Sequence, residues 1–448
     1  MKSLSLAERR DMILNGSPIK TIFRLSLPTI IMSIITAFIP LTDGLFLNNF
    51  ASPEIASAVG YSQPYINVLT GFSLGLGAAA MSIIGQANGQ GDIKKVRDTS
   101  LQIFLTALVF ALIMVPLALI VAFIAKLFAL SQISNSVWLY ISMNSIYLPM
   151  LFMASIFNSI KNATGQPEAT LTRVVILLIL KITFNSIFLS WLRLDVVGAS
   201  LATIISYTLL SIWMYYDLFK KKSELRFDIK GFRFDFILIK RLFIIAIPSM
   251  ISYALVNLGF ILINIEVNSY GVNVLVAQSI ASNVNSLCFT LPAAIGTTVT
   301  VMVSMNISVN NVRKAKQSLF IGCITSLIIS AAIILAIWPN IDFIVRLFQH
   351  ENMDIINTAV GALKIYTLSI LGYGIFMVVQ GAFIGLGRTK PPLFFGLFRM
   401  WLIRYIFILF TRHILLEYSV FWGNLVSNYV AAILFFAYIM MIRWEFKN

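Results

Sequence analysis

Long apolar runs recur along this chain of 448 residues, and each run is long enough to cross a lipid bilayer. About 20 helical residues span the hydrocarbon core of a membrane, where a helix satisfies its own backbone polar groups. Hydrophobic residues make up 59% of the chain and charged residues only 11%. We therefore predict an all-α integral membrane protein whose twelve transmembrane helices lie near residues 22–47, 61–86, 101–125, 136–160, 171–191, 197–219, 242–269, 275–304, 318–338, 361–385, 393–412 and 419–442.

The basic residues predict which ends of these helices face the cytoplasm. Because Lys and Arg collect in cytoplasmic loops, a net charge of +15 does not require a nucleic-acid partner. If the N-terminus is cytoplasmic, the inner loops hold most of the basic residues, and the outer loops hold only Lys126, Arg193, Arg346 and Arg412. The pattern predicts a multi-pass protein of the plasma membrane with both termini in the cytoplasm.

The longest polar connection, residues 220–241, separates two related halves. We expect a six-helix bundle at 1–219, a basic cytoplasmic linker at 220–241 and a second six-helix bundle at 242–448. Leu25-Ser26-Leu27-Pro28 matches Ile245-Ala246-Ile247-Pro248 in the second half. Because six is even, both bundles enter the membrane from the same side, and we expect a cavity at their interface. Pro28 and Pro248 are predicted hinges, since proline interrupts helical hydrogen bonding.

Short motifs along nearly the whole chain resemble those of the multidrug and toxic compound extrusion (MATE) family of transporters. The resemblance implies two six-helix bundles around a central cleft, and export driven by inward flow of protons or sodium ions. The motifs are Asn15-Gly16-Ser17-Pro18, Leu41-Thr42-Asp43-Gly44-Leu45-Phe46, Gly85-Gln86-Ala87-Asn88-Gly89, Gly198-Ala199-Ser200-Leu201-Ala202-Thr203, Tyr270-Gly271 and Gly385-Leu386-Gly387-Arg388-Thr389.

Asp43 is an acidic residue inside the first apolar segment, near its predicted outer end. A carboxylate at membrane depth is costly unless it is paired or wetted, so it commonly marks a transport pathway. In the family that the chain resembles, the aspartate at this position is the cation-responsive group of the first bundle. We expect Asp43 to bind a proton or a sodium ion and so to favour one packing of the helices. The alternative is an Asp that only caps the helix end.

The fifth helix departs from the family pattern of an Asn followed four residues later by an Asp. This chain has Lys181 and Asn185 at those positions. A buried lysine needs a partner, and its long stem could reach Asp43 at a similar depth. We hypothesise an Asp43–Lys181 ion pair in the first bundle, which would compete with a proton or a sodium ion for the carboxylate. A lysine facing a water-filled cleft is the alternative, and the missing second carboxylate puts ordinary family coupling in doubt.

Glu266 is the one strong acid within the predicted helices of the second half, near the outer end of the seventh helix. It lies one turn beyond the position that matches Asp43 in the repeat. We expect either a second cation or substrate site there, or an ion pair with Arg404 or Lys364. Arg399 and Arg404, on the eleventh helix, are expected to fix helix packing or to face the cleft.

A cleft that binds organic compounds needs apolar walls and a few polar groups. Any polar residue within a helix can instead hold two helices together, so each candidate alone is a weak prediction. The candidates for the substrate cleft are Asn67, Tyr140, Asn144, Asn158, Gln278, Asn283, Gln380 and Trp401.

Other kinds of site have little support in the sequence. Cys288 and Cys323 lie in apolar segments and are expected to be buried and unpaired, and the isolated His350 and His413 suggest no metal site. No phosphate-binding loop and no arrangement of Ser, His and Asp at one depth is present. We expect no catalytic residue and no cofactor besides the coupling proton or sodium ion.

The sequence thus favours a cation-coupled antiporter that exports small amphipathic or cationic organic compounds by alternating access. Its expected partners are the lipid bilayer, the organic substrate and the coupling cation, and the expected state is a monomer. A flippase for lipid-linked saccharides is the main alternative, because Lys181, Arg399 and Arg404 could hold a pyrophosphate. A membrane-embedded transferase would need a catalytic acid cluster that is missing. A non-transporting scaffold would result if Lys181 locked Asp43 permanently.

Overall fold

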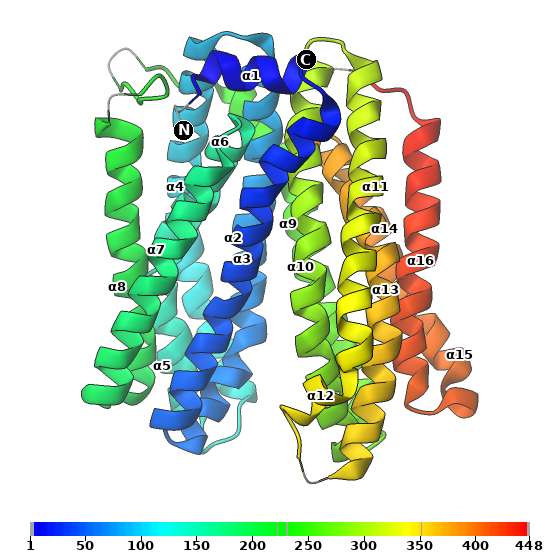
Figure 1. Ribbon diagram of the computed structural model, residues 1–448. Coiled ribbons are helices and arrows are strands. Elements are labelled where there is room, and N and C mark those ends of the chain that lie inside the picture. The colour runs from blue at the N-terminus through cyan, green and yellow to red at the C-terminus, as the bar shows by residue number, and fades with distance from the viewer. Residues whose placement is uncertain (1–3, 222, 230–231, 351, 446–448) are drawn as a thin grey trace. The chain divides into compact units, whose positions relative to one another are not determined.

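The computed structural model describes residues 4–221, 223–229, 232–350 and 352–445, and these residues form helices and connecting loops without a β-strand. Eleven helices of this described part are long and apolar enough to cross a membrane (Figure 1). The pair α5 (Ser134–Ser145) and α6 (Leu148–Ala163), bent by 49°, supplies a twelfth span. The predicted fold class is therefore confirmed, and each predicted span overlaps one observed helix or helix pair.

The first half begins with the short helix α1 (Leu6–Leu14). Long helices follow it, and two of them end in a π-helical segment, η1 (Ser186–Trp191) after α7 and η2 (Tyr216–Lys220) after α8. The other helices of this half are α2 (Pro18–Phe50), α3 (Pro53–Gln90), α4 (Ile93–Phe128), α7 (Pro167–Asn185) and α8 (Asp195–Tyr215).

The second half repeats this succession of long helices. The eleventh span of the chain, which lies in this half, contains a central π-helical segment, η4 (Phe398–Arg404), which joins α14 (Lys390–Leu397) to α15 (Tyr405–Leu415). The other elements are α9 (Phe236–Asn268), α10 (Val272–Ser308), α11 (Val312–Ile337), the single turn η3 (Trp338–Asn340), α12 (Ile341–Arg346), α13 (Met353–Gly385) and α16 (Tyr418–Met441).

Local sequence explains where several of these helices begin and end. Ser52 and Asp92 precede α3 and α4, and each side chain accepts a hydrogen bond from a backbone N–H of the first turn. Gly165 and Gly387 follow α6 and α13 with φ of 72° and 71°. Glycine adopts this left-handed conformation without a steric penalty, so it ends a helix at matching places in the two halves.

By their internal contacts the residues form two compact units. Unit 1 comprises Met1–Met12 and Ile31–Ala254, and unit 2 comprises Ile13–Ile30 and Leu255–Asn448. This division differs from the expected boundaries at residues 219 and 242, because α1, α2 and α9 each contribute residues to both units. The linker also differs from a purely polar loop, since Leu225 and Phe227 are buried in the core of unit 1.

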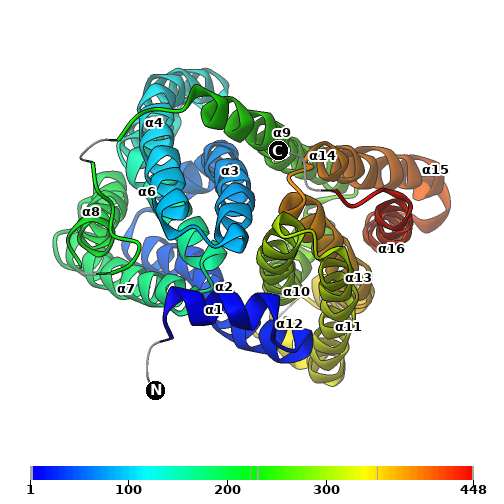
Figure 2. The same cartoon turned by 90° about the horizontal axis from the view of Figure 1, so that it is seen from above.

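Within each unit, small residues let helices approach closely. In unit 1, Ser159 donates a hydrogen bond to the carbonyl of Gly77, which joins α6 to α3 at 2.7 Å. In unit 2, α13 lies beside α10 and α16 (Figure 2). A Cβ added to Gly381 of α13 would lie 2.1 Å from the carbonyl oxygen of Gly296 in α10. Such close backbone packing is typical of helices in membranes.

Candidate functional site in unit 1

Asp43 lies in the C-terminal half of α2 and contacts two side chains of α7. Its Oδ2 is 2.9 Å from Lys181 Nζ, and its Oδ1 accepts a hydrogen bond of 2.7 Å from Asn185 Nδ2. Lys181 and Asn185 are four residues apart, so both side chains emerge on one face of the helix. The Asp43 side chain is 31% exposed and that of Lys181 is 4% exposed. The predicted Asp43–Lys181 ion pair is therefore present in the structure.

A second helix also contacts the lysine of this pair. Lys181 Nζ donates a hydrogen bond of 2.7 Å to Thr203 Oγ1 in α8, and the Thr203 hydroxyl donates to the carbonyl of Ala199. The lysine thus joins α2, α7 and α8 through one ammonium group. Thr203 is not among the predicted site residues, and the signal for it in the sequence is its place in the motif that begins at Gly198.

Two of the predicted cleft residues, Tyr140 and Asn144 of α5, lie close to this ion pair. Tyr140 is buried within electrostatic reach of the Asp43 carboxylate, and Gln63 of α3 hydrogen-bonds to its hydroxyl. Asn144 donates to Ser200 Oγ in α8 at 3.3 Å. Polar groups from α3, α5 and α8 therefore lie around the ion pair of α2 and α7 inside unit 1.

The α-helical geometry of α7 changes directly beside the ion pair. α7 ends at Asn185, and the next residue begins the π-helical segment η1. π-Helical turns are rare and occur often at functional sites, because they redirect the neighbouring side chains. The change therefore marks the region of Asp43 as structurally specialised.

The remaining predicted cleft residues do not join this cluster among the contacts that the structure describes. Asn67 and Asn283 are exposed, and Gln380 is partly buried. In unit 1, Asn158 accepts a hydrogen bond of 2.8 Å from Arg173 Nε. In unit 2, Gln278 accepts one of 2.6 Å from the Tyr366 hydroxyl, and Trp401 donates to the carbonyl of Leu255. These contacts hold neighbouring helices together, the alternative recognised in the sequence.

Glu266 has a different neighbour from the ones expected. Its Oε1 is 4.0 Å from Arg412 Nη1, while Arg404 is buried elsewhere in unit 2 and Lys364 is exposed. The expected pairing with Arg404 or Lys364 was therefore wrong. The sequence predicts an outer loop at Arg412, whereas α15 extends far enough to include it.

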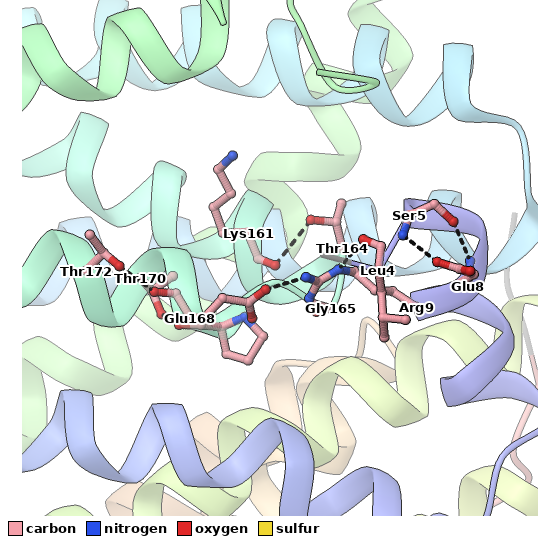
Figure 3. A network of polar contacts seen from close by, with 11 residues as sticks. Leu4, Ser5, Glu8, Arg9, Lys161, Thr164, Gly165, Glu168, Thr170 and Thr172 are labelled. Atoms are coloured by element: carbon pink, nitrogen blue, oxygen red, sulfur yellow. Dashed lines mark hydrogen bonds and ion pairs between the residues drawn. The ribbon is translucent and has the colours of Figure 1, made fainter. Parts of the chain in front are cut away.

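A further polar network in unit 1, shown in Figure 3, was missed in the sequence. Arg9 of α1 donates to the carbonyl of Leu4 at 3.1 Å and to that of Gly165 at 2.5 Å, and forms an ion pair with Glu168 at the start of α7. Ser5 and Glu8 cap α1 reciprocally. The network therefore fastens α1 to the junction of α6 and α7.

Next to this network lies an open cavity of about 1150 Å³. Lys161 and Asp217 line it and form an ion pair whose two side chains are only 6% and 7% exposed. Lys221 also reaches Asp217, at 3.1 Å. The signal for this pair in the sequence is Asp217, an acid inside the predicted span 197–219.

Comparison with known proteins agrees with this architecture. The family model MatE matches residues 28–187 and 248–410. The multidrug export protein MepA of Staphylococcus haemolyticus is 22% identical, over 97% of this chain and 95% of its own. The probable multidrug resistance protein YoeA of Bacillus subtilis is also 22% identical, over 84% of this chain and 82% of its own.

A solved structure of a multidrug resistance MATE family transporter in an outward-facing conformation shares the fold. Its TM-score is 0.89 at 22% identity, over 96% of this chain and 97% of that one. The match to the family model covers most of the chain and includes both the Asp43 region and the corresponding part of the second half. The chain belongs to the MatE family.

Proposed function

We propose that this protein is a cation-coupled exporter of small organic compounds, with Asp43 as the coupling carboxylate. Several relatives are named as multidrug resistance or multidrug export proteins, which supports the export of varied organic compounds. The proposal depends chiefly on one observation, the ion pair of Asp43 and Lys181 within helices long enough to span a membrane.

The ion pair supports coupling because the Lys181 ammonium and a coupling cation compete for the single negative charge of Asp43. In the structure the Lys181 ammonium neutralises Asp43. A proton on Asp43 would remove that negative charge and leave the buried ammonium with the Thr203 hydroxyl as its hydrogen-bond partner. A buried cation without a counter-charge is costly, so proton binding would favour a rearrangement of α2, α7 and α8. A sodium ion at the carboxylate would displace the ammonium with the same result.

The proposal includes alternating access, a multi-pass location in the plasma membrane and cytoplasmic termini. Alternating access requires two arrangements of similar free energy, and a ligand can select between them only if it binds one more tightly. The Asp43 pair supports such a selection, because the proton and the ammonium cannot both neutralise the carboxylate. The excess of Lys and Arg in the inner loops supports the orientation.

The test is efflux of a fluorescent organic dye from inverted vesicles under separate pH and sodium gradients. We expect one of the two gradients to drive efflux by the wild-type protein. Asp43→Asn should abolish the response to that gradient, because the amide binds neither a proton nor a sodium ion strongly. Glu54→Gln is the matched control, since Glu54 is an exposed acid in the same unit. Efflux that ignores both gradients, or that survives Asp43→Asn, would refute the proposal.

A further inference from the structure

Two arginines of unit 2 lie near the middle of a span. Arg399 and Arg404 both belong to η4, inside the span Lys390–Leu415. At about 1.5 Å per residue, each lies roughly 14 to 17 Å from the nearer end of that span, close to the centre of the hydrocarbon core. Arg404 is only 4% exposed. Charged groups at this depth are rare and usually take part in function.

Neither guanidinium has an acidic partner among the side chains that the structure describes. No described carboxylate oxygen lies within 4.0 Å of Arg399 or Arg404. Arg399 Nη1 donates to Asn428 Oδ1 at 2.6 Å, and Arg404 hydrogen-bonds to the Tyr366 hydroxyl, but the Nε atoms of both arginines are buried without a hydrogen-bond partner in the described part of the chain. The two positive charges also repel each other. The segment is therefore short of negative charge and of hydrogen-bond acceptors.

The internal repeat shows that this shortage is specific to the second half. Lys181 lies 16 residues after Gly165, and Arg404 lies 17 residues after Gly387, the glycine with the matching backbone conformation. Lys181 has the carboxylate of Asp43 at 2.9 Å. The nearest acid of α9, Glu266, lies one turn beyond the position that matches Asp43, and it is near Arg412 instead. Unit 1 thus supplies its own counter-charge at this position, whereas unit 2 does not.

Aromatic rings surround the two arginines. The Arg399 guanidinium carbon is 4.9 Å from the ring centre of Phe376 and 5.4 Å from that of Tyr373. Tyr373 stacks on Phe289 at 3.9 Å, and the Arg404 guanidinium carbon is 5.9 Å from the ring centre of Phe260. Rings attract a cation weakly and also offer flat apolar surface to a ligand. The surroundings suit a molecule that carries both an anionic group and a ring.

We propose that Arg399 and Arg404 form an anion-binding site in unit 2, which takes the carboxylate or phosphate of an amphipathic, ring-bearing organic anion. Guanidinium groups bind such oxygens through paired, charge-assisted hydrogen bonds. The π-helical turn at η4 supports this role, because it presents residues five apart on nearly the same face. The site goes beyond the coupling role of Asp43 and requires no ion gradient.

The test is calorimetric titration of the full-length protein in phosphatidylcholine nanodiscs. The probe is 1-naphthoate, an aromatic carboxylate, and 1-naphthylmethylammonium is the matched aromatic cation. We expect naphthoate to bind the wild-type protein at least about tenfold more tightly than the ammonium compound. Arg399→Gln and Arg404→Gln should each weaken naphthoate binding about tenfold, and Arg404→Lys should weaken it less.

Arg412→Gln is the matched control, because Arg412 lies at the exposed end of the same span and its loss should leave naphthoate binding unchanged. A second series in nanodiscs of equal parts phosphatidylglycerol and phosphatidylcholine separates two sources of the anion. If a lipid phosphate occupies the site, the apparent affinity for naphthoate falls there in the wild-type protein.

Two results would overturn the proposal. One is a wild-type protein that binds naphthoate no better than the ammonium compound, and this comparison does not depend on whether any variant folds. The other is equal naphthoate binding by the wild-type protein and the folded glutamine variants. Because the titration measures binding without a gradient, this site and the coupling role of Asp43 can fail independently.

Discussion

At the scale of single residues, the contact between Asp43 and Lys181 combines a stabilising and a functional role. Lys181 is almost fully buried and has two oxygen neighbours, the Asp43 carboxylate and the Thr203 hydroxyl. Removing one partner of a buried pair leaves the other charge uncompensated, whereas removing both is often tolerated. The pair therefore gives a prediction about stability that is separate from transport.

We expect Asp43→Asn to destabilise the protein by about 1 to 3 kcal/mol, less than a fully buried pair because the carboxylate is partly exposed. The double variant Asp43→Asn/Lys181→Met should recover most of that loss, since no buried charge remains. Thermal unfolding in detergent measures both effects. If the destabilisation of the double variant equals the sum of those caused by Asp43→Asn and by Lys181→Met alone, the two charges do not interact appreciably.

At the scale of helices, stability depends on close backbone contact where glycine has no side chain. Gly381 of α13 packs on Gly296 of α10, and Thr300 donates a hydrogen bond of 2.9 Å to the Gly381 carbonyl. A methyl group at Gly381 cannot fit unless the two helices separate. This contact depends on how α10 and α13 pack together, and the sequence of neither helix alone predicts it.

Gly381→Ala should therefore lower stability by about 1 to 3 kcal/mol through overpacking, and thermal unfolding measures the change. Gly60→Ala in α3 is the matched control, because a Cβ there meets no atom within 4 Å. The control should be neutral or slightly stabilising, since alanine favours helix more than glycine does. Equal effects of the two substitutions would contradict the packing argument.

The second prediction at this scale concerns how α1 is held. Arg9→Gln removes the ion pair with Glu168 and weakens the contact with the Gly165 carbonyl. We expect a loss of about 1 to 2 kcal/mol in α1 docking, and roughly tenfold faster hydrogen exchange of residues 6–14 by mass spectrometry. Lys20→Gln, an exposed charge on α2, is the control. Unchanged exchange in the Arg9 variant would show that the apolar contacts of α1 suffice.

At the scale of the whole molecule, the chain passes between its two units at places close to the predicted hinges. The unit boundaries lie at Met12/Ile13, Ile30/Ile31 and Ala254/Leu255, and the last two lie a few residues after Pro28 and Pro248. Proline lacks the N–H of the regular helical hydrogen bond, so α2 and α9 bend more easily there. A change in the arrangement of the units must involve these two helices, because each contributes to both.

Pro28→Ala and Pro248→Ala should slow dye efflux several-fold without loss of thermal stability, because alanine restores the helical hydrogen bond and stiffens the segment. Efflux from vesicles and unfolding in detergent measure the two quantities. Pro116→Ala is the control, since Pro116 lies inside α4, which belongs entirely to unit 1. Normal efflux in both hinge variants would exclude hinge bending at these prolines.

The sequence by itself determined the number of spans, the helical class and the family. A helix needs about 20 apolar residues to cross the bilayer, and only a helix or a closed barrel satisfies its backbone hydrogen bonds there, so the apolar runs predict the spans. It also identified Asp43 and Lys181, since charges are rare at membrane depth. Only the tertiary structure decided their third partner Thr203, the pairing of Glu266 with Arg412, and the Arg9–Glu168 network. These contacts join helices distant in sequence, and the choice among nearby partners depends on a few ångströms of helix rotation and depth, which residue spacing does not specify.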